Sequence, residues 1–139
     1  MNHQGGISAY QQVRIQSSSR EALVAILYER LLGLLTRASV QIENGDIEGK
    51  ADSLGRATEI VFELMASLDF EAGGEIASRL AALYSFFSRE ISEIGRTLDR
   101  ERLDRVVEMV ASLHEAWAQA AAMIQAGAAS ADAAVTRNA

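Results

Sequence analysis

Apolar residues recur at every third or fourth position from about residue 18 to about residue 126. This period is typical of amphipathic α-helices, whereas a half-buried strand would alternate apolar and polar residues, and no run of the sequence does so. We predict four long helices, over residues 18–44, over residues 46–69, after Gly73-Gly74, and from Asp99 to about residue 126. The apolar stripes of the last three are Leu54, Ala57, Val61, Leu64, Met65 and Leu68; Ile76, Leu80, Leu83, Phe87, Ile91, Ile94 and Leu98; and Leu103, Val106, Val110, Leu113, Trp117, Ala121 and Ile124.

The residues at the predicted helix ends are of the types that cap helices. Ser18 and Glu21 have the spacing of a capping box, in which each side chain accepts a hydrogen bond from the other residue's backbone N–H. Gly45 can adopt the left-handed conformation that ends a helix, and Asp46 and Asp99 can cap the helices that follow them. Because the connections are short, helices that are neighbours in the sequence must run antiparallel. We therefore predict an all-α fold, an antiparallel up-down four-helix bundle over residues 18–126.

Two terminal segments fall outside the predicted bundle. Residues 1–17 form a mostly polar N-terminal arm, in which Ile7, Tyr10 and Val13 are spaced so that a helical turn would place them on one face. Residues 127–139 consist mainly of Ala, Gly, Ser and Asp and have little to bury. We expect them to form a flexible tail, either disordered or a fraying extension of the fourth helix.

The first predicted helix is more apolar than a surface helix requires. Between Leu23 and Leu35, apolar residues cover more than half of its circumference, whereas a stripe of about 100° is enough for an amphipathic helix. One interpretation is that this is the central helix of the bundle, covered by neighbours on two sides. The other is that part of it faces a groove that a partner fills.

The composition is that of one small globular domain. The chain has 139 residues, of which 49% are hydrophobic and 23% charged, and it has no cysteine. The lack of cysteine excludes disulfides and thiolate metal sites and fits a reducing cytosol. The net charge of −6 disfavours nucleic acid as a partner. The first residues do not resemble a signal peptide, and no apolar run approaches the ~20 residues of a membrane helix. We expect a cytoplasmic protein without membrane insertion.

Few residues could carry catalysis or hold a metal. A di-iron bundle requires Glu-x-x-His pairs on facing helices, and neither His3 nor His114 follows a glutamate by three residues. His114 also lies at the edge of an apolar stripe, which disfavours a phosphotransfer role. Gly73-Gly74 does not fit a phosphate-binding loop, because no strand precedes it and no Gly-Lys-Ser/Thr follows. We therefore expect a binding protein rather than an enzyme, with no catalytic residue, metal or cofactor.

Several strings, in order along the chain, resemble the FliS family of flagellin export chaperones. The most specific is LDFEAGGEIA at residues 68–77, where the family carries Leu-Asp-x-Glu-x-Gly-Gly-Glu-Ile-Ala. The others lie at residues 6–10, 27–29, 42–46, 83–84 and 115–117, so the resemblance extends from about residue 6 to about residue 120. The chain departs from the family at residues 18–20, where Ser-Pro is usual, and at residues 94–95, where Ala-Asn is usual.

This resemblance implies a function. Such chaperones hold the disordered C-terminal segment of flagellin in the cytoplasm, prevent its premature polymerisation and assist its delivery to the flagellar type III export gate. The resemblance implies that the arm caps an apolar pocket when the client is absent and contacts an export gate protein when the chaperone is loaded. It also favours the groove interpretation of the first helix, and the residues expected to line that groove are Leu23, Ile26, Leu27, Leu31 and Leu34.

Two questions about partners stay open at this point. The alternative function is that of a generic four-helix interaction or regulatory domain without an export role. The sequence also leaves open whether the client-free protein forms a homodimer.

Overall fold

The structure, a computed structural model, describes residues 19–138. These residues form four α-helices and no strand: α2 (Arg20–Glu43), α3 (Ile47–Ala66), α4 (Phe70–Thr97) and α5 (Arg100–Asn138). The predicted all-α, four-helix fold is confirmed. Ile7, Tyr10 and Val13 of the predicted N-terminal arm lie outside the described residues.

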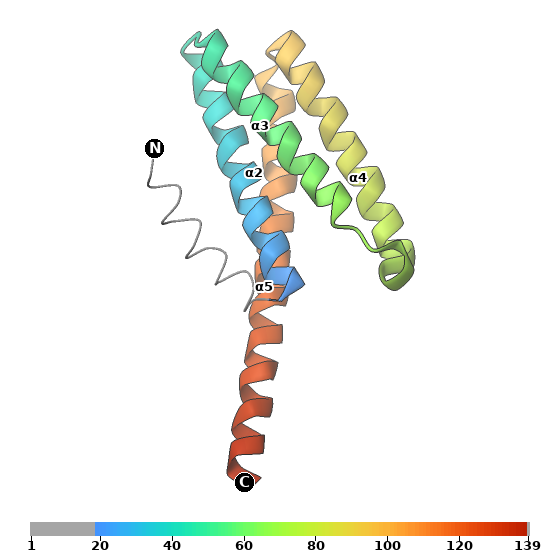
Figure 1. The fold of residues 1–139 in the computed structure, drawn as a ribbon. Coiled ribbons are helices and arrows are strands. Elements are labelled where there is room, and N and C mark those ends of the chain that lie inside the picture. The colour runs from blue at the N-terminus through green and yellow to red at the C-terminus, as the bar shows by residue number, and fades with distance from the viewer. Residues whose placement is uncertain (1–18, 139) are drawn as a thin grey trace, which may run out of the picture. The chain divides into compact units, whose positions relative to one another are not determined.

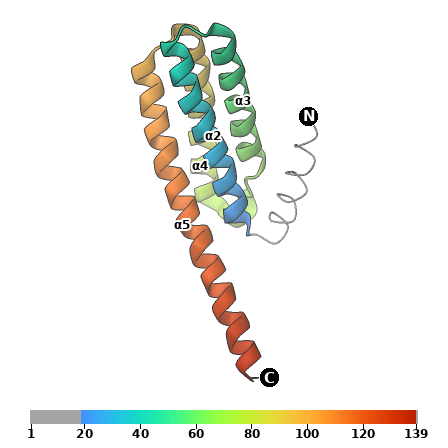
Figure 2. The ribbon, with the colours of Figure 1, turned by 90° about the vertical axis from the view of Figure 1, so that its left-hand side faces the viewer.

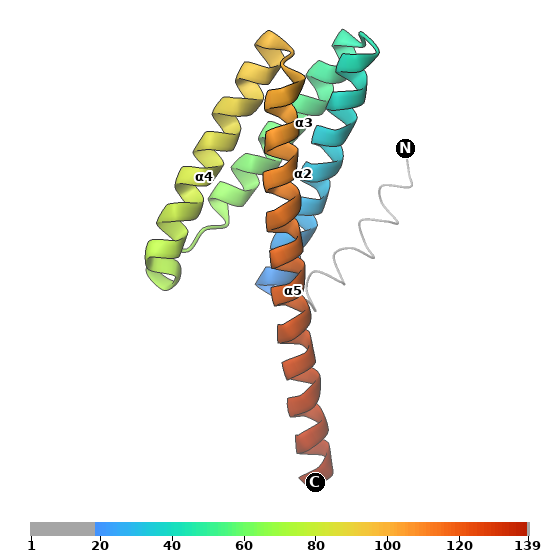
Figure 3. The ribbon, with the colours of Figure 1, turned by 180° about the vertical axis from the view of Figure 1, so that it is seen from behind.

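The chain divides into two compact units. One is Leu27–Leu113, and the other comprises, among the described residues, 19–26 and 114–138. Within Leu27–Leu113, each helix runs antiparallel to the next, as the colours show in Figure 1. Figure 2 shows α2 in front of α4 with α3 and α5 on either side, and Figure 3 shows the same arrangement from another direction. Helices that follow one another in sequence are therefore neighbours in the bundle.

The bundle has a continuous apolar core to which all four helices contribute. Phe87 is fully buried, as its place in the predicted stripe indicated. The buried apolar residues of this unit are Leu27, Tyr28, Leu31, Leu35, Ala38, Leu54, Ala57, Ile60, Val61, Leu64, Ala77, Tyr84, Phe87, Ile91, Ile94, Leu103, Val106 and Val110. Three residues of the predicted stripes are exposed rather than buried: Ile76 is 68% exposed, Leu98 is 44% exposed and, in the other unit, Ile124 is 45% exposed. Ile76 follows a kink that turns Ala77 inward instead, and Leu98 lies just beyond the end of α4.

Two tyrosines join α2 to α4 across this core. The Tyr28 hydroxyl donates a hydrogen bond of 3.0 Å to the Tyr84 hydroxyl, and the ring centroids lie 6.3 Å apart. A buried hydroxyl without a partner destabilises a fold, so the bond lets the core accommodate two phenols.

The turn between α2 and α3 has the predicted capping residues. Gly45 has a positive φ of 71°, and the Asp46 side chain accepts a 2.9 Å hydrogen bond from the Gly49 N–H. Beyond the turn, the buried Ser53 Oγ donates a 2.7 Å hydrogen bond to Gln41 Oε1. This bond links α3 to α2 and fixes which of their residues lie opposite one another.

The connection between α3 and α4 differs from the prediction. α3 ends at Ala66, before the predicted residue 69, and Asp69 instead caps α4 by accepting 3.1 Å hydrogen bonds from the N–H groups of Glu71 and Ala72. As predicted, the glycine pair interrupts the helix. Gly74 has φ 50° and ψ −121°, a non-helical conformation that kinks α4 between a first turn and its longer remainder. The cap lets a first helical turn form ahead of the kink.

At the corner between α4 and α5, the backbone reverses without a glycine. Leu98 takes the left-handed conformation with φ 60°, and the predicted cap, Asp99, accepts a 3.1 Å hydrogen bond from the Arg102 N–H. Arg102 also forms a 2.9 Å ion pair with Glu90 of α4, and both side chains are half-buried. A half-buried pair is screened by salt less than an exposed one, so this contact supports the corner.

In the second unit, the serine that caps α2 lies one residue later than predicted. Ser18 lies outside the described residues, and it is Ser19 whose Oγ accepts a 3.2 Å hydrogen bond from the Ala22 N–H. Val24 is buried, whereas Trp117 is half-buried rather than fully buried.

Of the two forms expected for residues 127–139, disordered or an extension of the fourth helix, the structure has the helical one. α5 continues through residues 127–138 to end at Asn138, although every residue from 122 to 136 is exposed. The physical reason is composition, because this stretch is rich in alanine, the strongest helix former, and contains no proline. It also extends a helix that is already formed, so it avoids the cost of nucleation.

Candidate binding grooves

A groove of about 390 Å³ lies between α2 and α3. Its floor is formed by Leu34, Gly33 and Ile60, and charged side chains surround it. The lining residues are Arg30, Gly33, Leu34 and Arg37 from α2 and Arg56, Glu59, Ile60 and Glu63 from α3. An apolar floor with a charged rim is the arrangement that accepts one face of an amphipathic helix.

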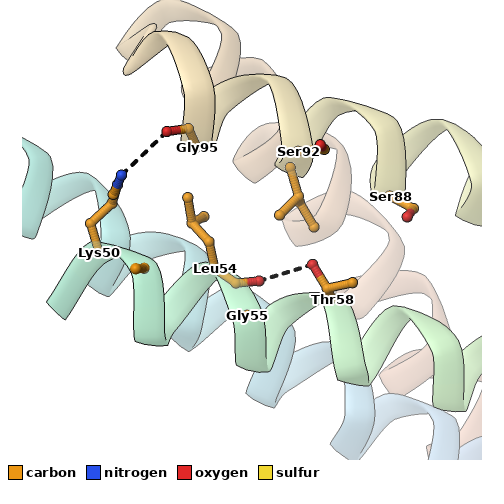
Figure 4. Close-up of a pocket in the computed structure, with 9 residues that line it drawn as sticks. Lys50, Leu54, Gly55, Thr58, Ser88, Ser92 and Gly95 are labelled. Carbon is orange, nitrogen blue, oxygen red and sulfur yellow. Dashed lines mark hydrogen bonds between the residues drawn. The ribbon is translucent and has the colours of Figure 1, made fainter. Parts of the chain in front are cut away.

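A second groove, of about 460 Å³, lies on the other side of α3, between α3 and α4. Figure 4 shows Lys50 reaching from α3 toward α4, where its Nζ donates a 3.2 Å hydrogen bond to the carbonyl of Gly95. Gly95 is in the last turn of α4, where backbone carbonyls lack helical partners and a positive charge is stabilising. The groove is lined by Lys50, Ala51, Leu54, Gly55, Thr58, Ser88, Ile91, Ser92 and Gly95.

The predicted groove residues of α2 occupy different environments. Leu31 is fully buried and Leu27 is 8% exposed, so a client would reach them only after the residues that cover them have moved. Leu34 is half-buried and lines the α2–α3 groove. Leu23 and Ile26 are half-buried in the other unit. The structure thus brings one of the five, Leu34, to an open groove of the bundle.

Sequence reasoning missed Gly33 and Ile60, which lie beside Leu34 in the groove. Ile60 was not recognised because it belongs to α3, and its position opposite Leu34 depends on how the two helices pack. Gly33 could have been recognised from the sequence. A glycine in the interior of a strongly helical run is unfavourable by about 0.5–1 kcal/mol relative to alanine, so it often has a packing or binding role.

The electrostatics of the described residues do not suggest catalysis. Burial raises the pKa of Tyr84, and the hydrogen bond from Tyr28 offsets part of this rise. Glu93 has a lowered pKa, chiefly because Arg96 donates a hydrogen bond to it. Both shifts have structural causes. Within residues 19–138, no three metal-binding side chains lie close enough together to hold an ion.

None of the helices in the described part of the chain has the length and apolarity needed to cross a membrane.

Comparison with known proteins identifies the family of the chain. The family model Flagellar protein FliS matches residues 3–124. The flagellar secretion chaperone FliS of Salmonella typhimurium is 34% identical over 119 residues, which cover 82% of this chain and 88% of the relative. FliS of Campylobacter jejuni is 36% identical over 110 residues, which cover 79% and 86%. FliS of Bacillus subtilis is 29% identical over 117 residues, which cover 84% and 86%.

These relatives are chaperones, which agrees with the expectation of a binding protein rather than an enzyme. The family match also covers every string on which the resemblance rested, from residue 6 to residue 117. The chain belongs to the FliS family of flagellar secretion chaperones.

Proposed function

We propose that this protein binds the C-terminal segment of a flagellin in the cytoplasm and prevents its premature polymerisation before export. The observation that carries this proposal is membership of the flagellar secretion chaperone family over residues 3–124. The alternative, a four-helix regulatory domain without an export role, loses support because the relatives that cover most of the chain are secretion chaperones.

The grooves on both sides of α3 give this function a physical basis. A flagellin segment that is disordered on its own must lose conformational entropy when it folds on a chaperone, so the binding surface has to be extensive. The α2–α3 groove offers an apolar floor at Leu34 and Ile60, and the α3–α4 groove adds further surface on the same bundle. Such grooves accept helical residues spaced three and four apart, which are the residues flagellin would otherwise use to polymerise.

We also propose a role for the N-terminal arm. Ile7, Tyr10 and Val13 are its apolar residues with helical spacing, and each apolar side chain of this size gains about 1.5–3 kcal/mol on burial. The arm would cover an apolar pocket of the client-free protein. Binding of flagellin would displace it, and the displaced arm would contact an export gate protein and report that the chaperone is loaded.

The decisive experiment uses a peptide of the last ~40 residues of the host's flagellin, which should be largely unstructured alone. Calorimetry should show one-to-one binding with a negative heat-capacity change from apolar burial, and circular dichroism should show a gain of helix. Light scattering before and after the peptide is added establishes whether a homodimer dissociates. If the folded protein binds no flagellin of its host, the proposed function is wrong.

A variant that lacks residues 1–15 tests the arm within the same experiment. If the arm covers the client groove, this variant should bind the peptide with equal or higher affinity and should bind more of an apolar dye. A large loss of affinity would place the arm in the client site and contradict the covering role.

A further inference from the structure

The α2–α3 groove is positively charged although the protein is acidic. Three arginines and two glutamates line it, Arg30, Arg37, Arg56, Glu59 and Glu63, so its formal charge is +1 (three positive minus two negative). The whole chain has a net charge of −6. A local excess of positive charge on an acidic protein favours a partner that brings negative charge to that place.

The register of the helices shows where this charge is concentrated. Gln41 of α2 is hydrogen-bonded to Ser53 of α3, and antiparallel helices rise by the same amount per residue. Counting four residues back from Gln41 in α2 and four residues forward from Ser53 in α3 places Arg37 level with residue 57. Arg37 therefore lies next to Arg56. By the same count, Arg30 lies level with residue 64, next to Glu63. One end of the groove therefore has arginines on both sides, and the other end is charge-balanced.

The arginines at the basic end are available to a ligand. Among the described residues, Arg37 has no ion pair and no hydrogen bond from its side chain. Arg56 pairs only with Asp52 of its own helix, at 3.1 Å, and both side chains are more than half exposed. Exposed pairs of this kind contribute little, so a ligand carboxylate could replace Asp52 at small cost.

Gly33 leaves open space beside the groove floor. A Cβ atom placed on Gly33 would meet no atom within 4 Å, so packing inside the described protein does not require a glycine at this position. A glycine in a helix interior is nonetheless less stable than alanine. The missing side chain leaves space over the groove floor for a partner's backbone or side chain.

From these observations we infer that the α2–α3 groove binds an amphipathic helical segment of the client with an acidic residue beside its apolar anchor. The apolar anchor lies over Gly33, Leu34 and Ile60, and the carboxylate binds between Arg37 and Arg56. This inference rests on the proposed function and adds the chemistry of the client segment. The chain's own arm does not fit this end of the groove, because residues 1–17 contain one arginine and no acidic residue.

The test measures binding of the flagellin peptide to the full chain with Arg37→Glu and Arg56→Glu combined. Reversing both charges should weaken binding at least about tenfold at low salt. Added salt should then lower the affinity of the parent but not that of the double variant, because the reversed charges repel the ligand carboxylate. Arg37→Gln should give a smaller loss in the same direction. Arg105→Glu is the matched control, because Arg105 is an exposed arginine outside both grooves, and it should bind as the parent does. Circular dichroism confirms that each variant is folded.

Peptides in which each acidic residue is replaced in turn by lysine identify the partner residue. One of them should recover much of its affinity for the Arg37→Glu, Arg56→Glu variant while it binds the parent less well. If the double variant binds every peptide as the parent does, the carboxylate site is wrong, although flagellin binding stands. If the parent binds no peptide, the proposed function fails and this inference fails with it.

Gly33→Ala tests the site of the apolar anchor, over Gly33, Leu34 and Ile60, independently of charge. Because alanine favours helix and would meet no atom here, this variant should have a higher Tm than the parent and yet bind the peptide more weakly. Gly127→Ala is the matched control, since Gly127 is also helical with no atom near its missing Cβ, and it should leave affinity unchanged. If Gly33→Ala binds the peptide as tightly as the parent does, the client does not bind in this groove. If a groove variant changes the oligomeric state of the protein but not its affinity for the peptide, the groove binds a second copy of the chain. That result would overturn the inference.

Discussion

Tyr84 is the residue whose chemistry depends most on the core of the bundle. Its side chain is 1% exposed, and its hydroxyl accepts a hydrogen bond from Tyr28. Burial disfavours the phenolate and raises the pKa of Tyr84, while the bond from Tyr28 lowers it to a lesser extent. The folded protein therefore holds the Tyr84 proton more tightly than the unfolded chain does.

We predict that this pKa difference makes the fold sensitive to alkali. The folded pKa lies above the unfolded pKa of about 10, so the contribution of Tyr84 is fully present below about pH 10 and is lost as pH rises through the folded value. Tyr84→Phe should flatten the decline of the free energy of unfolding above about pH 10. At neutral pH it should cost about 1–3 kcal/mol, because Tyr28 loses this acceptor.

Denaturant unfolding between neutral pH and pH 11 or so checks this prediction. Tyr28→Phe is the control, because it removes the hydrogen bond but keeps the ionisable, buried Tyr84 and should therefore keep the alkaline decline. Equal pH profiles for the parent and Tyr84→Phe would show that other groups cause the alkaline loss.

Among the helices, α4 depends most on a single backbone conformation. Gly74 has φ 50° and ψ −121°, a combination that residues with a Cβ avoid. We predict that Gly74→Ala destabilises the fold by about 1–3 kcal/mol, because the kink must either strain the alanine or straighten. Gly73→Ala should cost less, since its new Cβ would meet only the Ala77 Cβ, at 3.0 Å. Urea midpoints of the two variants provide the comparison, and the prediction is wrong if Gly74→Ala unfolds at the parent's midpoint.

This helix also shows how far the sequence determined the fold. Helical periodicity gave the helix number and type, and the cap residues Asp46 and Asp99 and the left-handed Gly45 were predicted from local chemistry alone. The glycine pair, after which the third helix was expected to start, provides the positive φ of Gly74. Periodicity could not show that the chain before Gly74 is already helical, because that turn depends on the cap at Asp69.

The binding grooves were much harder to predict than the helices. A groove is a property of two packed helices, and its lining depends on a register that no single helix encodes. The apolar excess of the first helix drew attention to Leu34, but it could not separate Leu34 from the buried Leu31 one turn away. That distinction requires the position of α3, which the Gln41–Ser53 hydrogen bond helps to set.

For the molecule as a whole, the family match and the buried part of α5 end within a few residues of each other. The family match stops at residue 124, and all residues from 122 to 136 are exposed. The remaining part of α5 is helical through its alanine content rather than through packing. Residues 127–139 contain one acidic and one basic residue, Asp132 and Arg137, so their removal leaves the net charge at −6.

We predict that a chain ending at residue 126 keeps the stability and the client affinity of the full protein. Its denaturant midpoint should match that of the full chain, because the side chains of residues 127–136 are all exposed and contribute little to the free energy of unfolding. Its circular dichroism should show less helix. A chain ending at residue 116 is the control, since it also lacks Trp117, Ala120 and Ala121, which are half-buried, and it should unfold at a lower denaturant concentration. If the chain ending at 126 is also destabilised, residues 127–139 stabilise the fold by a contact absent from this structure. If it folds normally but binds the flagellin peptide less well, the extension of α5 takes part in client binding.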